Sequence, residues 1–167
     1  MPVLSEELQR HPVDVSTPNG QLFAHLRWPD QIEITIDPGF AERRGDQETA
    51  EQLGRLARLL FAARAATYEG VKNQVLEPNG PRIERPRDIA YREAYEQLAV
   101  EASSNDGSVS VTCVGLQFWT VTVASGSADR IGSSGIAQAA TEAANKVVAE
   151  LRQAVRDLRH ETYKSHD

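Results

Sequence analysis

The stretch Gly107-Ser-Val-Ser-Val-Thr-Cys-Val-Gly115 alternates apolar residues with serine or threonine, and Phe118 to Ala124 alternates in the same way. Alternation with a period of two indicates strands that are covered on one face. The short Gly115-Leu-Gln117 connection favours a tight hairpin between them. From Ile136 to about His160, apolar positions recur every three or four residues, which predicts a long amphipathic helix. A hairpin and one helix cannot bury both apolar surfaces alone, so this unit needs a partner.

The first half of the sequence repeats this pattern. A shift of 87 residues, the separation between Gly20 and Gly107, aligns the segment from Gly20 to Trp28 with Gly107 to Gly115 without a gap. The second strand and the helix then align in phase: Ile32, Ile34 and Ile36 fall on Trp119, Val121 and Val123, and Leu53, Leu56 and Leu60 fall on Ala140, Ala143 and Val147. We therefore predict an α+β fold of two pseudo-symmetric ββα halves, in which antiparallel hairpins pack with long helices.

The duplication divides the chain into three segments. Residues 1–70 form the first half, residues 71–87 a proline-rich connector, and residues 88–167 the second half. Prolines at three positions of the connector, with Asn79-Gly80 between them, indicate an exposed linker. We expect each half to contribute its hairpin and its helix to one shared core.

Three further helical segments are predicted from caps and periodicity. A short helical turn is expected around Ser5 to Arg10, with Ser5 as its cap. Asp46 fits the N-cap of a helix from Gln47 to about Gly70. In the second half, Asp88 fits the cap of a helix that continues to about Ala102, ahead of the hairpin.

Composition limits the classes of function. The formal net charge is −6 and the pI is about 5.3, so any surface for nucleic acid has to be a local basic patch. The single cysteine, Cys113, excludes an internal disulfide framework and fits a reducing compartment. The N-terminus carries Glu6 and Glu7 and lacks an apolar core, and no apolar run approaches transmembrane length. The sequence therefore predicts a cytoplasmic protein without a membrane partner.

No pattern of chemically reactive residues stands out. The histidines are scattered, and none has a second ligand at metal-binding spacing. Gly132-Ser-Ser-Gly135 precedes a helix but lacks the lysine of a phosphate-binding loop, so Ser133 or Ser134 is better explained as an N-cap. Cys113 lies on the inward face of its strand, where it is expected to act as a small buried apolar residue. We expect no enzyme activity, no metal, no cofactor and no small-molecule substrate.

Short motifs carry a family resemblance. Val109-Ser-Val-Thr-Cys-Val-Gly115 is similar to the Val-x-Val-Thr-x-x-Gly hairpin of the YbaB/EbfC family, and Asn145 matches an asparagine of that family's long helix. In the first half, Ile34-Thr-Ile-Asp-Pro38 resembles the end of the family's hairpin, whereas Arg58 replaces the helix asparagine and Trp28 the hairpin glycine. The resemblance covers about two thirds of the chain. It implies a single-chain tandem of a unit that the family assembles as a homodimer.

The resemblance also implies two classes of partner. The YbaB/EbfC family consists of nucleoid-associated proteins that bind DNA. Divergent relatives are found among the Esp proteins that accompany actinobacterial ESX (type VII) secretion, and the Pro18-Asn-Gly20 turn followed by a helix rich in alanine and arginine looks closer to those.

Two kinds of surface residue are candidates for contact with a partner. Candidates for contact with DNA or a partner protein are the arginines near or along the helices: Arg43, Arg44, Arg58, Arg152, Arg156 and Arg159. The alternative is that these arginines are solvated and pair with neighbouring carboxylates such as Glu150, Asp157 and Glu161. Candidate apolar contacts are residues on the outward phase of strands or off the helix stripe: Phe23, Phe118, Leu59 and Phe61.

Two functions therefore remain open. The first is a non-catalytic YbaB-like accessory or scaffold protein that binds other proteins or itself, linked to ESX secretion. The alternative is a nucleoid-associated protein that grips duplex DNA through its arginines. Steep loss of DNA affinity with rising salt would distinguish the second from the first.

Overall fold

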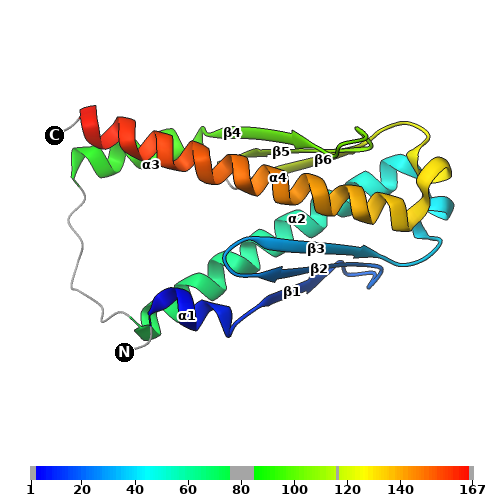
Figure 1. Ribbon diagram of the computed structural model, residues 1–167, viewed down its shortest axis with the longest axis horizontal. Helices are drawn as coiled ribbons and strands as arrows, with labels where there is room; N and C mark the ends of the chain where they lie inside the picture. Colours follow the sequence, from blue (N-terminus) through cyan, green and yellow to red (C-terminus); the bar gives the residue numbers. More distant parts are fainter. Residues whose placement is uncertain (1–2, 76–84, 116, 166–167) are drawn as a thin grey trace.

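Two three-stranded antiparallel sheets and four helices make up the part of the chain that the computed structural model describes, residues 3–75, 85–115 and 117–165. The first half contains α1 (Leu4–Gln9), β1 (Val13–Ser16), β2 (Leu22–Arg27), β3 (Gln31–Ile36) and α2 (Phe40–Val75). The second half contains α3 (Pro86–Glu96), β4 (Ala99–Ser103), β5 (Val109–Val114), β6 (Phe118–Val123) and α4 (Ser127–Ser165). Figure 1 shows each long helix running beside a sheet of its own half. The mixed α+β composition that the sequence predicted is confirmed.

The duplicated order of elements is αβββα rather than ββα. The predicted hairpins are present, with Leu26 opposite Ile32 in β2–β3 and Cys113 opposite Trp119 in β5–β6. Each hairpin carries a third strand, β1 or β4, on the outer side of its first strand. Strand β4 lies inside the segment predicted as helix up to Ala102, and that prediction was wrong. Only Val100 of β4 is buried, so the strand has almost no alternation of its own and depends on its ladder with β5.

The element boundaries repeat at the interval that the sequence predicted. Strands β5 and β6 begin and end 87 residues after β2 and β3, and α4 begins 87 residues after α2. Backbone breaks repeat too: Gly45 in α2 and Gly132 in α4 both have positive φ, 87° and 66°. At these two positions the left-handed backbone favours glycine. A short first turn precedes each break, so both helices begin earlier than predicted, at Phe40 and Ser127.

Three other predicted boundaries shift. Helix α2 continues to Val75, beyond the predicted end at Gly70, because no helix breaker occurs before Pro78. The predicted helical turn near the N-terminus is present as α1, with Val3 and not Ser5 at its N-cap. Helix α3 begins at Pro86, and Asp88 accepts a hydrogen bond from the amide of Arg85 (3.1 Å) rather than occupying the cap position itself. Most of the predicted connector, residues 76–84, lies outside the described residues.

The core lies between the sheets and the two long helices. Leu22, Leu26, Val109 and Cys113 on the inward faces of β2 and β5 are fully buried, which confirms the expected role of Cys113. The predicted helix stripes are buried as well: Leu53, Leu56, Leu60, Ala140, Ala143 and Val147. Phe61 of α2 stacks on Trp119 of β6 at 4.1 Å between ring centroids, so apolar packing crosses from one half to the other. The halves thus share one core.

Helix α3 extends the second half along α4. Its Tyr91 ring stacks on Tyr163 of α4 at 6.2 Å, and the Tyr163 hydroxyl lies 3.5 Å from Asp88. At this end of the molecule α3 and α4 form one arm, while α1 and the end of α2 form the other (Figure 1). The two arms diverge.

Candidate binding cleft between the two arms

The first turns of the two long helices are capped across the halves. The Asp46 carboxylate of α2 accepts hydrogen bonds from the amides of Gly126 (2.8 Å) and Ala128 (2.7 Å) at the start of α4. The Ser133 hydroxyl of α4 accepts one from the amide of Ala41 (2.9 Å) at the start of α2. From the sequence, both residues were predicted as N-caps, but each as the cap of its own helix. This reciprocal capping closes one end of the molecule.

The free edge of β3 is sealed by α4. The Asn145 side chain accepts a hydrogen bond from the amide of Ile32 (3.0 Å) and donates one to its carbonyl (2.9 Å), and the Thr141 hydroxyl accepts from the amide of Ile34 (2.9 Å). In the other half, Arg58 donates to the Trp119 carbonyl (3.2 Å) at the edge of β6. Arg58 was predicted to contact DNA or a partner, and in this structure it contacts the strand edge. Thr141 has Gly54 as its counterpart in α2.

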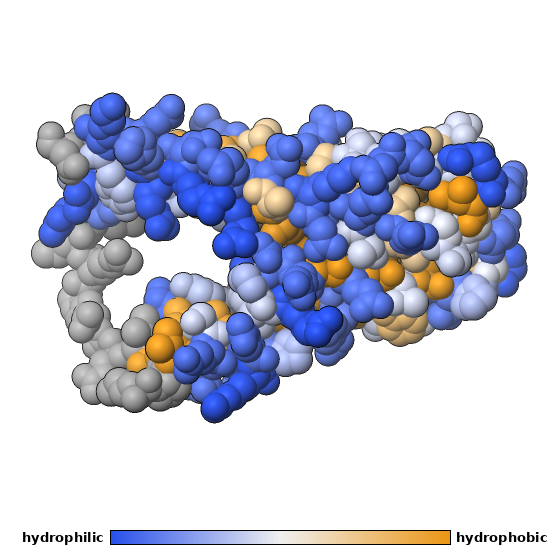
Figure 2. Space-filling model, viewed as in Figure 1, coloured by the Kyte–Doolittle hydropathy of each residue, from blue (hydrophilic) through white to orange (hydrophobic). Residues whose placement is uncertain are grey.

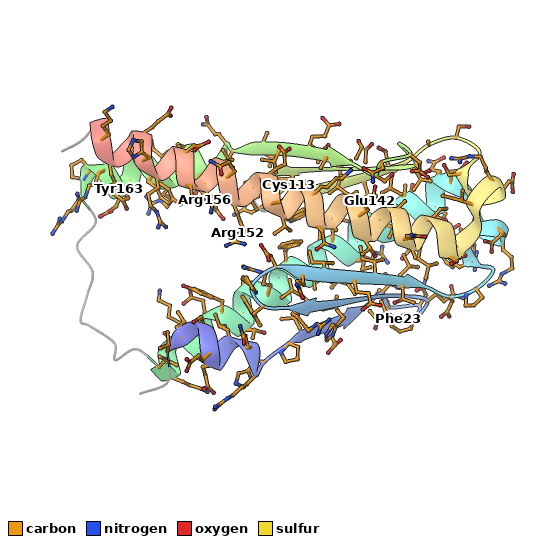
Figure 3. All side chains as sticks on the ribbon, in the orientation of Figure 1. Phe23, Cys113, Glu142, Arg152, Arg156 and Tyr163 are labelled. Atoms are coloured by element: carbon orange, nitrogen blue, oxygen red, sulfur yellow. The ribbon has the colours of Figure 1, made fainter. Side chains whose placement is uncertain are left out.

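A cleft of about 300 Å³ opens where the two arms begin to diverge. Figure 2 shows the hollow between the arms, and Figure 3 shows Arg152 and Arg156 projecting from α4 towards it. Its floor is apolar and comes from both halves: Leu26, Phe61, Val148, Leu151 and Val155. Its polar lining consists of Arg64, Arg152, Arg156 and Asp30. A cavity of this size, with an apolar lining and few charged groups, has the character of a ligand-binding site.

Arg64 of α2 is fixed in the cleft from several sides. Its guanidinium lies 4.7 Å from the centre of the Trp28 ring and donates a hydrogen bond to the Pro29 carbonyl (3.2 Å). Trp28 is itself fixed, because its indole N–H donates to the His11 carbonyl (2.7 Å). Burial lowers the pKa of Arg64 from its usual value, and the nearby Asp30 carboxylate opposes that shift. The cleft therefore holds a partly desolvated cation in one orientation.

The two arginines of α4 are less constrained. Arg152 pairs with Asp30 in the β2–β3 turn (2.5 Å), which bridges the two halves at the mouth of the cleft. Arg156 donates to the side chain of Gln153 (2.9 Å) on its own helix. Among the described residues, the side-chain partners of Arg152 and Arg156 are thus Asp30 and Gln153, whereas the sequence suggested neighbouring carboxylates such as Glu150, Asp157 and Glu161.

The remaining predicted arginines lie elsewhere. Arg43 and Arg44 follow the start of α2, at the end of the molecule opposite the arms, and Arg44 lies 3.9 Å from Glu48. Arg159 lies over the Tyr91 ring at 5.8 Å. The structure thus brings Arg152 and Arg156 together but does not unite the predicted arginines into one surface.

The predicted apolar contacts are also distributed. Phe118 is 67% exposed on β6, Phe23 is 40% exposed on β2, and Leu59 is 38% exposed on α2. Phe61 is half-buried between the halves and lines the cleft. Sequence reasoning missed Asp30, which lines the cleft, and Trp28, which packs on Arg64. Both lie in a turn that only the fold brings beside α2 and α4.

Comparison with known proteins gives no match to a family model, to a curated protein or to a solved structure. Across residues 3–75, 85–115 and 117–165, no helix is both long and apolar enough to cross a membrane. Within the same ranges, no group of three or more histidine, cysteine, aspartate or glutamate side chains is arranged to hold a metal ion.

Proposed function

We propose that this chain is a non-catalytic binding protein of YbaB-like architecture, in which two pseudo-symmetric halves replace the two subunits of a homodimer. Its cleft receives a segment of a partner protein. The link to ESX secretion belongs to this proposal and is based on the sequence resemblance alone.

Matching hydrogen bonds in the two halves support the internal duplication. In the β1–β2 turn, Asn19 accepts a hydrogen bond from the amide of Gln21 (3.1 Å). At the matching position of the β4–β5 turn, Asp106 accepts one from the amide of Ser108 (2.9 Å). The reciprocal caps described above obey the same shift of 87 residues. Such agreement in detail is expected of a duplicated unit that acts as its own dimer partner.

The cleft is the observation that supports protein binding. Interfaces between proteins have an apolar core that is enriched in aromatic and arginine side chains. The floor from Leu26 to Val155, bordered by three arginines, has this composition. It also needs both halves, because residues of β2, α2 and α4 all line it. A single half would have no such site.

Duplex DNA is the alternative occupant. The observation in its favour is that Arg152, Arg156 and Arg159 all lie on α4, three or four residues apart. Against it, Arg152 is paired with Asp30, and Arg159 lies on Tyr91. An apolar floor also adds nothing to phosphate binding, which is electrostatic. We therefore favour a protein partner.

Site-specific photo-crosslinking in the cells of origin tests the proposal. A photoreactive amino acid at position 156 samples the cleft, and one at Glu101, an exposed residue of β4, is the matched control. We expect a defined protein adduct from position 156 and not from position 101. A parallel mobility-shift titration with a 30-base-pair duplex should show no specific binding. Nucleic-acid adducts at position 156, together with a shift that weakens steeply with salt, would support the DNA alternative instead.

A further inference from the structure

We propose that the occupant of the cleft is an acidic amphipathic peptide segment, whose apolar side chains lie on the floor while its carboxylates meet Arg64, Arg152 and Arg156. This inference rests on the proposed function and names the chemistry of the partner.

Charge complementarity selects an acidic occupant. The cleft is lined by three arginines and one aspartate, whereas the whole chain has a formal net charge of −6. The cleft is therefore a local cationic site on an acidic protein. Guanidinium groups bind carboxylates in a planar, bidentate geometry that adds specificity to attraction.

The three guanidinium groups have donors to spare. Each guanidinium has five N–H groups. In the described part of the chain, Arg64 donates one hydrogen bond to Pro29, Arg152 one to Asp30 and Arg156 one to Gln153. The remaining N–H groups are available for carboxylates of a bound segment. Arg64 already has its position fixed by the Trp28 ring, so binding costs little further ordering of this side chain.

Because the floor of the cleft is apolar, its occupant needs apolar side chains as well as carboxylates. Leu26, Val148 and Leu151 are buried already, and Phe61 and Val155 are half-buried at the surface of the cleft. An occupant that covers them must present apolar side chains next to its carboxylates. An acidic chain without apolar residues gains nothing there.

The two halves contribute different side chains to the cleft at matching positions. Under the shift of 87 residues, Arg64 corresponds to Leu151, Arg152 to Ala65 and Arg156 to Glu69. The two walls of the cleft therefore differ in the number and position of their arginines, although they come from the same duplicated unit. A symmetric homodimer would present identical walls, whereas this cleft has one arginine on α2 and two on α4.

Fluorescence anisotropy with designed peptides tests this inference on the full-length protein. The probe is a labelled 16-residue peptide with leucine along one helical face and glutamate along the two borders of that face. Two matched peptides replace glutamate with lysine, or leucine with serine. We expect binding of the leucine–glutamate peptide only. The double variant R152Q/R156Q should weaken it at least about tenfold, whereas R55Q on the exposed face of α2, outside the cleft, should leave it unchanged.

A variant that binds the peptide more tightly must still be folded, so it distinguishes an effect on the site from loss of the fold. Asp30 competes with a ligand for Arg152, so D30N should tighten binding of the leucine–glutamate peptide about threefold or more. Binding of the lysine peptide, equal binding of all three peptides, or binding of dodecanoate or a DNA duplex in place of the peptide would overturn the inference. If no peptide binds while position 156 still crosslinks to a protein, the inference fails and the proposed function stands. If the adduct at position 156 is nucleic acid, both fail.

Discussion

Asp46 of the first half caps Ala128 of the second, through a 2.7 Å hydrogen bond from the Ala128 amide to the Asp46 carboxylate. The matching bond runs in the opposite direction, from the amide of Ala41 to the hydroxyl of Ser133 at 2.9 Å. In each long helix, one amide of the first turn is thus satisfied by a side chain of the other half. Docking of the two halves therefore completes the hydrogen bonding of both first turns.

Removing a cap should therefore destabilise the whole molecule. Asp46→Ala leaves two amides at the start of α4 without an acceptor, and we expect it to lower the free energy of unfolding by about 1–2 kcal/mol. Ser133→Ala should cost about 1 kcal/mol, because the buried amide of Ala41 loses one neutral acceptor. Denaturant unfolding followed by circular dichroism measures both.

Gln47 provides the control for these caps. It is exposed on the turn of α2 that follows Asp46. Gln47→Ala should leave the midpoint of unfolding nearly unchanged. An Asp46→Ala protein as stable as Gln47→Ala would show that the cross-half cap contributes nothing.

Gly54 offers a substitution that should stabilise the protein. It lies in the interior of α2, where a Cβ atom would meet its nearest neighbours only at 3.5–4.0 Å, an ordinary contact distance. Gly54→Ala should raise the free energy of unfolding by about 0.5–1 kcal/mol, because glycine is a poor helix former. Gly54→Thr introduces the residue type that α4 has at the matching position, Thr141. The new hydroxyl should reach the amide of Val121 at the β6 edge, as the Thr141 hydroxyl reaches the amide of Ile34.

Gly115 provides the opposite case. Its φ is 62°, and an added Cβ would lie 2.5 Å from the Glu96 carbonyl. Gly115→Ala should therefore lower the thermal midpoint, while Gly54→Ala raises it. Differential scanning calorimetry of the two variants compares them directly. A loss of stability in Gly54→Ala would mean that α2 and β6 lie closer together than this structure shows.

Asn145 should matter more than its counterpart Arg58. Asn145 satisfies both the amide and the carbonyl of Ile32 at the β3 edge, whereas Arg58 contacts the Trp119 carbonyl from a side chain that is itself exposed. Asn145→Ala should lower the free energy of unfolding by about 1–3 kcal/mol, and Arg58→Ala should lower it by about 1 kcal/mol or less. Exposed edges promote association between chains, so Asn145→Ala should also aggregate more readily on heating. Equal unfolding midpoints for the two variants would contradict this ranking.

The strand and helix phases were predictable because burial imposes them on the sequence. Ile32, Ile34 and Ile36 alternate as β3 requires, and Leu53, Leu56 and Leu60 keep the spacing of one buried helix face. Strand β4 was not predictable in this way. Of its residues from Ala99 to Ser103 only Val100 is buried, and alanine and glutamate favour a helix in the absence of the β5 ladder.

The cleft was only partly predictable. Arg152 and Arg156 were identified as cations on one helix face, and Phe61 as an apolar residue off the buried stripe. Their convergence with Asp30 depends on how the β2–β3 turn packs against α2 and α4. In the sequence, Asp30 is more than a hundred residues away from Arg152 of α4. Local periodicity carries no information about such contacts. Only the internal repeat indicated that the two halves would meet.

The β4–β5 turn should make stability depend on acid pH through one carboxylate. Asp106 accepts hydrogen bonds from the amide of Ser108 (2.9 Å) and the hydroxyl of Ser104 (2.8 Å). Hydrogen bonds from Ser108, followed by the one from Ser104, lower the pKa of Asp106 from 3.8 to about 2. Because the folded-state pKa is depressed, the stabilisation is fully present above the unfolded pKa and is lost as pH falls from about 3.8 through about 2.

The first half contains the natural control for this effect. Asn19 occupies the matching position and makes the matching hydrogen bond to the amide of Gln21 without a titrating group. Asp106→Asn should therefore preserve the turn at neutral pH and flatten the stability profile between about pH 4 and pH 2. Carboxyl carbon NMR should find Asp106 titrating near 2, and a midpoint near the ordinary aspartate value would show that the turn does not hold the charged form. Denaturant unfolding of both proteins across this range should give curves that converge at acid pH and separate above about pH 4.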